Sequence, residues 1–337
     1  MIVVTGGTGL VGAHLLFELA RTGKKVRAIR RKPESVAYAE KTFSYYSSDH
    51  QALFSRIEWV EGDVTDIHSL IDAMQEAEVV YHCAGMISYN PREVRHMMKV
   101  NVEGSANVAN ACLETGIRKL CHVSSVAAFG FNASGKTITE TSKWRSSPYN
   151  SNYDISKYGG EREIWRAAEE GLGVVIVNPS IILGPGRWTQ GSPQLFDRVY
   201  KGLKIYTRGS AGYIDVRDVV RAMVRLTESD VKNQRYILSA ENHPYKFFLE
   251  KVADALGRPR PRIEAGSLLL GLARRLDAIK SLLTGQPQVI TKEITRGARN
   301  RTYYSSEKIK QQLGMSFIPV ERSIKEIADI YLKEFRG

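Results

Sequence analysis

The residues of this sequence most suited to chemistry are a tyrosine and a lysine four positions apart, Tyr153 and Lys157, in the stretch YDISK at 153–157. Residues at this spacing share one face of a helix. A tyrosine is a weak acid with a reference pKa of about 10. A nearby ammonium group stabilises its phenolate by Coulomb attraction. Such a pair suits proton transfer to or from a substrate oxygen near neutral pH. The same spacing also occurs where a tyrosine packs and a lysine reaches solvent, so other motifs must support it.

A glycine-rich stretch, TGGTGLVG at 5–12, follows an apolar run at 2–4 and precedes a helical apolar pattern. Gly6 permits a tight turn, Gly9 permits close approach of phosphates, and Gly12 lets the helix pack against the strand. Together they predict a strand that turns into a helix whose N-terminus binds a dinucleotide pyrophosphate. The alternative is an ordinary glycine-rich turn.

Strand and helix patterns alternate through the first half of the chain, which predicts an α/β fold with a doubly wound parallel (Rossmann) sheet. The expected strands are 2–4, 25–29, 57–61, 79–82, 119–124, 174–178 and 235–239, and the expected helices between them include 66–76, 92–115 and 153–170. Beyond residue 178, glycines and prolines interrupt the pattern. A smaller, mainly helical lobe follows, with helices expected at 246–256, 267–283, 305–313 and 320–335.

These patterns divide the chain into two units. Residues 1–178 with 213–240 would form the dinucleotide-binding domain, and 179–212 with 241–337 the substrate-binding lobe. The active residues are expected at the carboxyl ends of the parallel strands, where ligands bind in such sheets.

The composition is that of a globular enzyme, with 337 residues, 43% hydrophobic and 25% charged. A first strand at residue 2 leaves no room for a signal peptide, and no uncharged apolar run approaches membrane-spanning length. We therefore expect a cytoplasmic protein without a transmembrane segment. Three cysteines, Cys83, Cys112 and Cys121, lack metal-ligand spacing and indicate a reducing compartment and no metal site.

The net charge of +12 comes largely from one segment, because residues 257–312 hold 12 Lys and Arg against 4 Asp and Glu, a net of +8. No aromatic residues interleave a basic stripe there, which argues against nucleic-acid binding. A solvated basic face is the simplest interpretation. An anionic substrate or an acidic membrane surface is the sharper alternative.

Seven stretches in order resemble the extended branch of the short-chain dehydrogenase/reductase superfamily, or NAD-dependent epimerase/dehydratase superfamily. They are TGGTGLVG at 5–12, GDVTD at 62–66, HCAG at 82–85, NVEGS at 101–105, VSSVAAFG at 123–130, YDISK at 153–157 and PSIILGPG at 179–186. The resemblance spans essentially the whole chain.

This resemblance implies the roles of four residues. Tyr153 would be the acid/base, and Lys157 would lower its pKa and hold the nicotinamide ribose. Ser125 would donate a hydrogen bond to the substrate oxygen. Asn101 resembles the asparagine that supports the lysine through water in relatives, although a hydrogen bond inside a helix explains it equally well.

The cofactor expected from these motifs is NADP, with NAD as the alternative. The second strand ends in Arg30-Arg31-Lys32 rather than in an acid that accepts hydrogen bonds from a ribose hydroxyl. Guanidinium groups such as those of Arg30 and Arg31 suit a 2′-phosphate. The other cofactor-binding residues implied by the resemblance are Thr5, Gly6, Thr8, Gly9, Leu10, Val11, Gly12, Asp63, Val64, Cys83, Ala84, Gly85, Pro179 and Ile181.

The substrate side departs from sugar-nucleotide enzymes at three places. Ser125 is followed by Val126-Ala127-Ala128, without the acid that dehydration needs. Ile181 and Gly212 stand where epimerases place an asparagine and an arginine for a diphosphate. These features resemble dihydroflavonol reductases and 3β-hydroxysteroid dehydrogenases, whose substrates are bulkier and less polar.

Three functions follow for the sequence. The first is an NAD(P)-dependent oxidoreductase that moves a hydride between nicotinamide and a carbonyl or alcohol carbon. The others are an epimerase or dehydratase of nucleotide sugars that retains NAD, and a dinucleotide sensor without catalysis. By resemblance, the helices near 92–115 and 153–170 would pair two copies into a homodimer.

Overall fold

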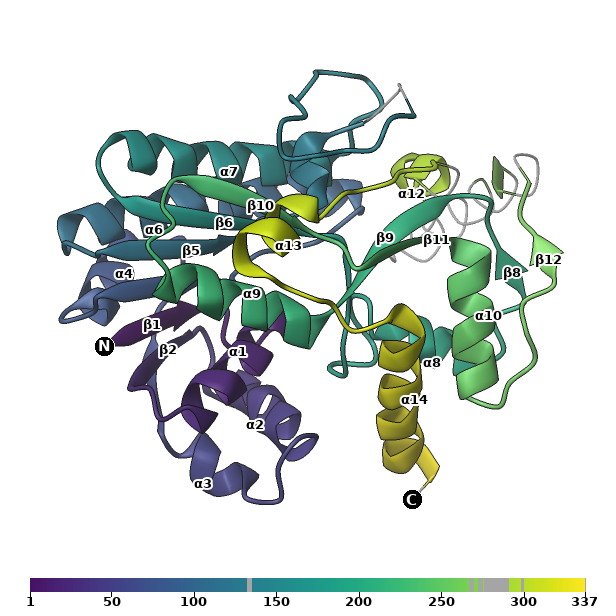
Figure 1. The fold of residues 1–337 in the computed structure, drawn as a ribbon, viewed down its shortest axis with the longest axis horizontal. Coiled ribbons are helices and arrows are strands. Elements are labelled where there is room, and N and C mark those ends of the chain that lie inside the picture. Colours follow the sequence, from purple (N-terminus) through teal and green to yellow (C-terminus); the bar gives the residue numbers. More distant parts are fainter. Residues whose placement is uncertain (132–134, 267–269, 272–274, 276–290, 298–299, 337) are drawn as a thin grey trace.

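The fold was analysed in a computed structural model that describes residues 1–131, 135–266, 270–271, 275, 291–297 and 300–336 (Figure 1). The helix expected at 267–283 lies almost entirely outside these residues. No helix in the described ranges is long and apolar enough to cross a membrane.

A seven-stranded parallel sheet forms the centre of the molecule, in the order β10-β6-β5-β4-β1-β2-β3. Its strands are β1 Ile2–Thr5, β2 Val26–Arg30, β3 Ile57–Glu61, β4 Val79–His82, β5 Lys119–Val123, β6 Gly173–Pro179 and β10 Gln234–Leu238. This confirms the doubly wound sheet predicted from the sequence. The strand order reverses between β1 and β4, and ligands bind at such a switch point.

Helices cover both faces of this sheet (Figure 1). One face carries α4 Ile67–Met74, α6 Gly104–Glu114 and α7 Asn152–Glu169, and the other carries α1 Leu10–Arg21 and α9 Val216–Glu228. Two further helices, α2 Val36–Ser44 and α3 His50–Phe54, lie beside α1. The sequence patterns did not lead us to predict α2, α3 or α9.

The helix expected at 92–115 is divided in the structure. A short 3-10 turn at Pro91–Glu93 leads into α5 Val94–Met98, then a π-helical turn at Lys99–Glu103, then α6. The π turn packs against α7, because a Cβ atom at Gly160 would lie 2.3 Å from the Asn101 carbonyl oxygen. Such wide turns often lie at functional sites.

The second lobe has its own core around Trp188, Phe196, Tyr213, Phe248 and Tyr331. A three-stranded sheet (β11-β9-β7) and a two-stranded sheet (β12-β8) support it. These strands are β7 Ile181–Leu183, β8 Ile205–Tyr206, β9 Ser210–Asp215, β11 Glu241–Pro244 and β12 Ile263–Glu264, and the helices are α8 Gln194–Tyr200, α10 Tyr245–Ala255, α12 Lys292–Gly297 and α14 Val320–Arg336.

One helix expected in that lobe belongs to the main sheet instead. Helix α13, Glu307–Leu313, packs beside β10, and its Ile309 is buried in the core between the sheet and α1. Gln312 accepts a hydrogen bond from the Tyr236 hydroxyl at 2.6 Å. The chain therefore returns to the half of the molecule built on the parallel sheet before ending in α14.

Two buried histidines lie side by side beneath the glycine-rich turn. His82 contacts the Thr5 hydroxyl through Nδ1 at 2.8 Å and the Ser105 hydroxyl through Nε2 at 3.2 Å. His122 lies against His82 with ring centroids 4.9 Å apart, and neither ring nitrogen has a hydrogen-bond partner among the described residues. Burial lowers the pKa of His82 to about 3 and the pKa of His122 well below its usual value.

These histidines predict loss of stability in mild acid. The unfolded chain binds protons below about pH 6.5 while the folded chain does not, so stability is complete above that pH and falls as the pH falls. Each buried histidine contributes at most about 1.4 kcal/mol of unfolding free energy per pH unit. Urea unfolding between pH 7 and pH 5 measures the slope. In the variant His122→Leu, the pH dependence of the unfolding free energy should fall by the amount that corresponds to about one bound proton. The substitution His68→Gln, at an exposed position, should not change this pH dependence.

Candidate active site

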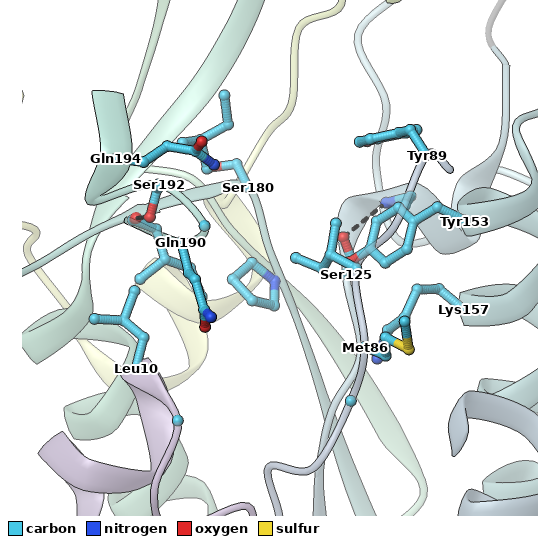
Figure 2. Close-up of a pocket in the computed structure, with 18 of the residues that line it drawn as sticks. Leu10, Met86, Tyr89, Ser125, Tyr153, Lys157, Ser180, Gln190, Ser192 and Gln194 are labelled. Carbon is cyan, nitrogen blue, oxygen red and sulfur yellow. Dashed lines mark hydrogen bonds between the residues drawn. The ribbon is translucent and has the colours of Figure 1, made fainter. Parts of the chain in front are cut away.

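The carboxyl ends of β1, β4, β5 and β6 open into a cleft of about 2610 Å³ between the two lobes. Figure 2 shows Ser125, Tyr153, Lys157 and Tyr89 along one wall of this cleft. Leu10 at the start of α1 lies on the opposite side in the same view. The cleft therefore joins the glycine-rich turn to the tyrosine and lysine.

The glycine-rich turn needs glycine at two positions for steric reasons. Gly6 has φ +68°, and a Cβ atom there would lie 2.5 Å from the Ala84 nitrogen. A Cβ atom at Gly12 would lie 2.2 Å from the Gly6 carbonyl oxygen. Gly9 precedes α1 without a side-chain cap, so the first N–H groups of the helix remain available to an anion.

Helix α7 positions the tyrosine and the lysine. It begins with a capping box, in which the Ser151 hydroxyl accepts from the Asp154 nitrogen and Asp154 accepts from the Ser151 nitrogen. Lys157 is buried, and its Nζ donates to the Val123 carbonyl at the end of β5, 3.0 Å away. This bond ties the lysine to the strand that leads into Ser125.

Ser125 begins a short 3-10 turn at Val126–Phe129, directly after β5. Its Oγ accepts a hydrogen bond from the Ala127 nitrogen at 3.1 Å. A serine hydroxyl also has one hydrogen to donate. Because this bond uses an acceptor position, the O–H of Ser125 can still donate, either to the Tyr153 oxygen or to a ligand in the cleft.

Burial shifts the pKa values of both Tyr153 and Lys157. Burial raises the pKa of Tyr153 to about 12, while a hydrogen bond with Ser125 acts in the opposite direction. Burial lowers the pKa of Lys157 to about 8, and the Glu161 carboxylate acts against that change. Because its pKa is raised, Tyr153 is a protonated phenol at neutral pH, the form that donates a proton.

A buried carboxylate that sequence reasoning missed, Glu161, holds the two strand ends and α7 together. Its side chain is 3% exposed and pairs with Arg235 at 3.1 Å. Its other oxygen accepts from the Ser124 hydroxyl at 2.6 Å and from Asn178 Nδ2 at 2.7 Å. Asn178 Nδ2 also donates to the Ser125 carbonyl at 3.0 Å. The sequence does contain a signal for Glu161, because it continues the four-residue spacing of Tyr153 and Lys157.

Asn101 lies in the π turn and bonds to protein groups. Its Oδ1 accepts from the Met86 nitrogen at 2.8 Å, and its Nδ2 donates to the Met86 carbonyl at 2.8 Å and the Ser156 hydroxyl at 2.9 Å. These bonds join the loop after β4 to α7. A Cβ atom at Gly85 would lie 3.6 Å from Asn101 Oδ1 and 3.9 Å from Lys157 Nζ, so the three residues are neighbours.

Most of the sequence-predicted cofactor residues line the cleft. They are Thr5, Gly6, Thr8, Gly9, Leu10, Val11, Arg31, Asp63, Val64, Cys83, Ala84, Gly85, Pro179 and Ile181. Three predicted site residues do not line it. Gly12 packs beneath the turn, Asn101 lies behind Met86, and Arg30 is the last residue of β2.

The far end of the cleft is lined by aromatic residues that the sequence analysis did not single out. They are Tyr89, Tyr213, Tyr245, Phe248 and Tyr304. Tyr89 lies at the edge of the Tyr153 ring, with centroids 6.2 Å apart. Tyr245 and Tyr304 come from parts of the chain distant in sequence, so no local pattern could have grouped them.

Comparison with known proteins agrees with this fold. The model of the NAD-dependent epimerase/dehydratase family matches residues 2–239. The chain therefore belongs to this enzyme family, as the seven collinear stretches indicated.

The chain is similar to curated members at modest identity. It is 28% identical over 283 residues to sterol demethylase protein B of Methylococcus capsulatus, with 82% of this chain and 81% of that protein covered. It is 28% identical over 339 residues to a putative dihydroflavonol 4-reductase of Synechocystis, with 96% and 92% covered.

Solved structures share the fold. The crystal structure of gox2253 has a TM-score of 0.80 at 26% identity and covers 100% of this chain and 99% of its own. UDP-glucose 4-epimerase from Thermotoga maritima with UDP-glucose has a TM-score of 0.77 at 19% identity, with 99% of both chains covered. At that identity the second likeness concerns the fold alone.

The Glu161 network predicts a large stability difference between two substitutions on α7. Glu161→Gln removes a buried negative charge and leaves Arg235 without a carboxylate partner, with only its hydrogen bonds to the Glu140 and Ser142 carbonyls, which should cost about 3 kcal/mol of unfolding free energy. Glu163→Gln breaks the solvent-exposed pair with Arg166 and should cost at most about 1 kcal/mol. Urea unfolding of both variants measures the difference. Equal losses would mean that Glu161 does not anchor the strand ends.

Proposed function

We propose that this protein is an oxidoreductase that transfers a hydride between a nicotinamide dinucleotide and the carbonyl or alcohol carbon of a bulky, weakly polar substrate. The observation that carries the proposal is the position of Ser125 and Tyr153 in one cleft with the glycine-rich turn. An acid/base group and a hydrogen-bond donor beside a pyrophosphate site suit this reaction.

The nucleotide side of the cleft fits such a cofactor. The backbone at Gly6 and Gly12 is closer to its neighbours than any side chain permits, and α1 presents uncapped N–H groups. When bound, the dinucleotide supplies or accepts the hydride. Lys157, adjacent to Gly85, would hold the nicotinamide ribose through its Nζ.

The chain's own residues handle the proton. The buried phenol of Tyr153 donates its proton to the carbonyl oxygen during reduction and takes it back during oxidation. The O–H of Ser125 would orient the same oxygen. Lys157 lies below Tyr153 in Figure 2, where its positive charge favours the phenolate that forms on proton release.

The substrate side favours a bulky ring system over a sugar nucleotide. Its walls include Tyr213, Tyr245 and Phe248. Position 212 has no room for a side chain, since a Cβ atom there would lie 2.2 Å from Ser239 Oγ and 2.9 Å from Ser180 Cβ. An arginine that binds a diphosphate therefore cannot occupy this position without rearrangement.

NADP is the proposed cofactor, with Arg31 and Lys32 as the basic residues that meet it. Both line the cleft just after β2, whereas Arg30 does not. The two residues directly after β2 are basic, so neither can accept hydrogen bonds from the ribose hydroxyls. The simplest role for Arg31 is therefore to bind the 2′-phosphate of NADP through its guanidinium group.

The two lobes would divide the work. Residues 1–178 with 213–240 would bind the dinucleotide, and 179–212 with 241–337 would supply most of the substrate walls. We further propose a homodimer formed through the face of α6 and α7. Sedimentation at several concentrations tests this dimer.

An epimerase of nucleotide sugars is the second candidate, because it would use the same tyrosine and lysine. It would retain its cofactor through each cycle. The epimerase would be favoured over the oxidoreductase if the purified protein contained tightly bound NAD and inverted a sugar without net consumption of cofactor. A dinucleotide sensor without catalysis has no need of all three residues Ser125, Tyr153 and Lys157, so their presence together argues against a sensor.

Substitution of Tyr153 tests the proposed proton transfer. With NADPH and a panel of aromatic and alicyclic ketones, Tyr153→Phe should lower turnover roughly 10²- to 10⁴-fold, because the proton donor is lost. Cofactor affinity, measured by NADPH fluorescence, should persist. Tyr158→Phe is the matched control, since Tyr158 stacks on Trp144 outside the cleft. Unchanged turnover in Tyr153→Phe would contradict the proposed mechanism.

Substitution of Arg31 tests the proposed preference for NADP. Arg31→Gln should weaken NADP binding roughly 10- to 100-fold, the effect of losing a charged hydrogen bond. It should leave NAD binding nearly unchanged. Arg30→Gln should change neither, because Arg30 does not line the cleft. Titration calorimetry with both dinucleotides measures these constants. Tighter binding of NAD than NADP by the unsubstituted protein would overturn the NADP assignment.

A further inference from the structure

A segment of the substrate lobe reaches across the cleft to the nucleotide side. It follows β7 and contains Gly186, Arg187 and Trp188. A Cβ atom at Gly186 would lie 3.2 Å from Leu10 Cδ1, so this backbone passes directly beside the first residue of α1. Arg187 therefore enters the nucleotide half of the cleft from the opposite lobe.

The guanidinium group of Arg187 is held in place but incompletely satisfied. Its Cζ lies 3.6 Å from the centroid of the Tyr38 ring on α2. Its buried Nε has no hydrogen-bond partner among the described residues. Stacking on a ring satisfies the face of a guanidinium and leaves its in-plane N–H groups to find acceptors. A buried donor without an acceptor is costly, which suggests that a ligand supplies one.

The surroundings of Arg187 are positively charged. Arg31, Lys32 and Tyr38 line the same cleft. None of Arg31, Lys32 and Arg187 forms an ion pair with another described residue, while the nearby Lys41 pairs with Glu334. Basic groups without a carboxylate partner make this part of the cleft favourable for an anion with several oxygens.

A second set of contacts fixes the segment against both lobes. Trp188 Nε1 donates to Glu334 Oε2 of α14 at 3.0 Å, and the Tyr45 hydroxyl of α2 donates to the same oxygen at 2.9 Å. Trp188 is 6% exposed and meets the Tyr331 ring edge-on, with centroids 4.9 Å apart. Glu334 thus joins α2, α14 and the residue that follows Arg187.

We infer that Arg187 is a specificity-determining residue that binds the 2′-phosphate of NADP from the substrate lobe, together with Arg31, and that Glu334 positions it through Trp188. This inference rests on the proposed use of NADP. It means that the phosphate distinguishing NADP from NAD contacts both lobes. NADP would then stabilise the arrangement of the two lobes more than NAD does.

The test compares ligands that differ only in the 2′-phosphate. Calorimetric titrations would use NADP, NAD, 2′,5′-ADP and 5′-AMP with the full-length protein. Arg187→Met should weaken NADP and 2′,5′-ADP roughly 10- to 100-fold and change NAD and 5′-AMP less than about 3-fold. Arg187→Lys should recover part of the loss, because it restores the charge without the planar donors. Arg198→Met is the control, since Arg198 lines the same cleft from α8 and bonds to Gln194.

The positioning role of Glu334 has its own readout. Glu334→Gln should weaken NADP but not NAD in the unsubstituted background, and it should have no further effect in the Arg187→Met background. A merely structural role would weaken both cofactors and add to the Arg187 effect. Thermal unfolding of each variant without ligand identifies general loss of stability.

The outcomes separate this inference from the proposed function. If NADP binds more tightly than NAD and Arg187→Met changes neither, the role of Arg187 is wrong and the NADP assignment stands. If Arg187→Met weakens NAD and NADP equally, Arg187 contacts the shared pyrophosphate and the inference fails. If NAD binds more tightly than NADP, the cofactor assignment fails together with the inference, while the Tyr153→Phe result still decides the oxidoreductase proposal.

Discussion

The geometry of the candidate active site depends on one buried carboxylate. Glu161 neutralises Arg235 and accepts hydrogen bonds from Ser124 at the end of β5 and Asn178 at the end of β6. A charge in the protein interior is tolerated only when it is paired and hydrogen-bonded, so these elements have little freedom to move apart. Lys157 lies one helical turn before Glu161 on α7, and its Nζ donates to Val123 in the strand that leads into Ser125. The relative positions of Ser125, Tyr153 and Lys157 therefore depend on how α7 is anchored.

The two ends of the cleft impose opposite requirements on their residues. At the glycine-rich turn the backbone packs so closely on itself and on Ala84 that no side chain fits at Gly6 or Gly12. At the substrate end large side chains such as Tyr245 and Phe248 form the walls. The same cleft thus combines a sterically restricted turn, where we propose that the dinucleotide binds, with a wider end that has several aromatic walls. Family members with different substrates can keep the first and vary the second.

Some differences between expectation and structure had a readable signal, and others did not. Helix α9 buries Val219, Val220, Met223 and Leu226 at helical spacing, so its pattern was visible in the sequence. The π turn around Asn101 has no such signal, because it arises where α6 packs against Gly160 of α7. Helix α13 is amphipathic, but which core its Ile309 joins depends on the path of the chain between the lobes. The approach of Arg187 to Tyr38 spans 149 positions and follows from the fold alone.

The sequence by itself determined the local chemistry: the glycine spacing that suits a pyrophosphate, the tyrosine and lysine one helical turn apart, and the alternating pattern of a doubly wound sheet. Each of these is a relation between residues close in the chain, where backbone geometry fixes the relative positions of side chains. Only the tertiary structure decided that Arg31 rather than Arg30 lines the cleft, that position 212 is closed to a side chain, and that Glu161 joins two strand ends. These depend on packing between segments distant in sequence, which no local pattern specifies.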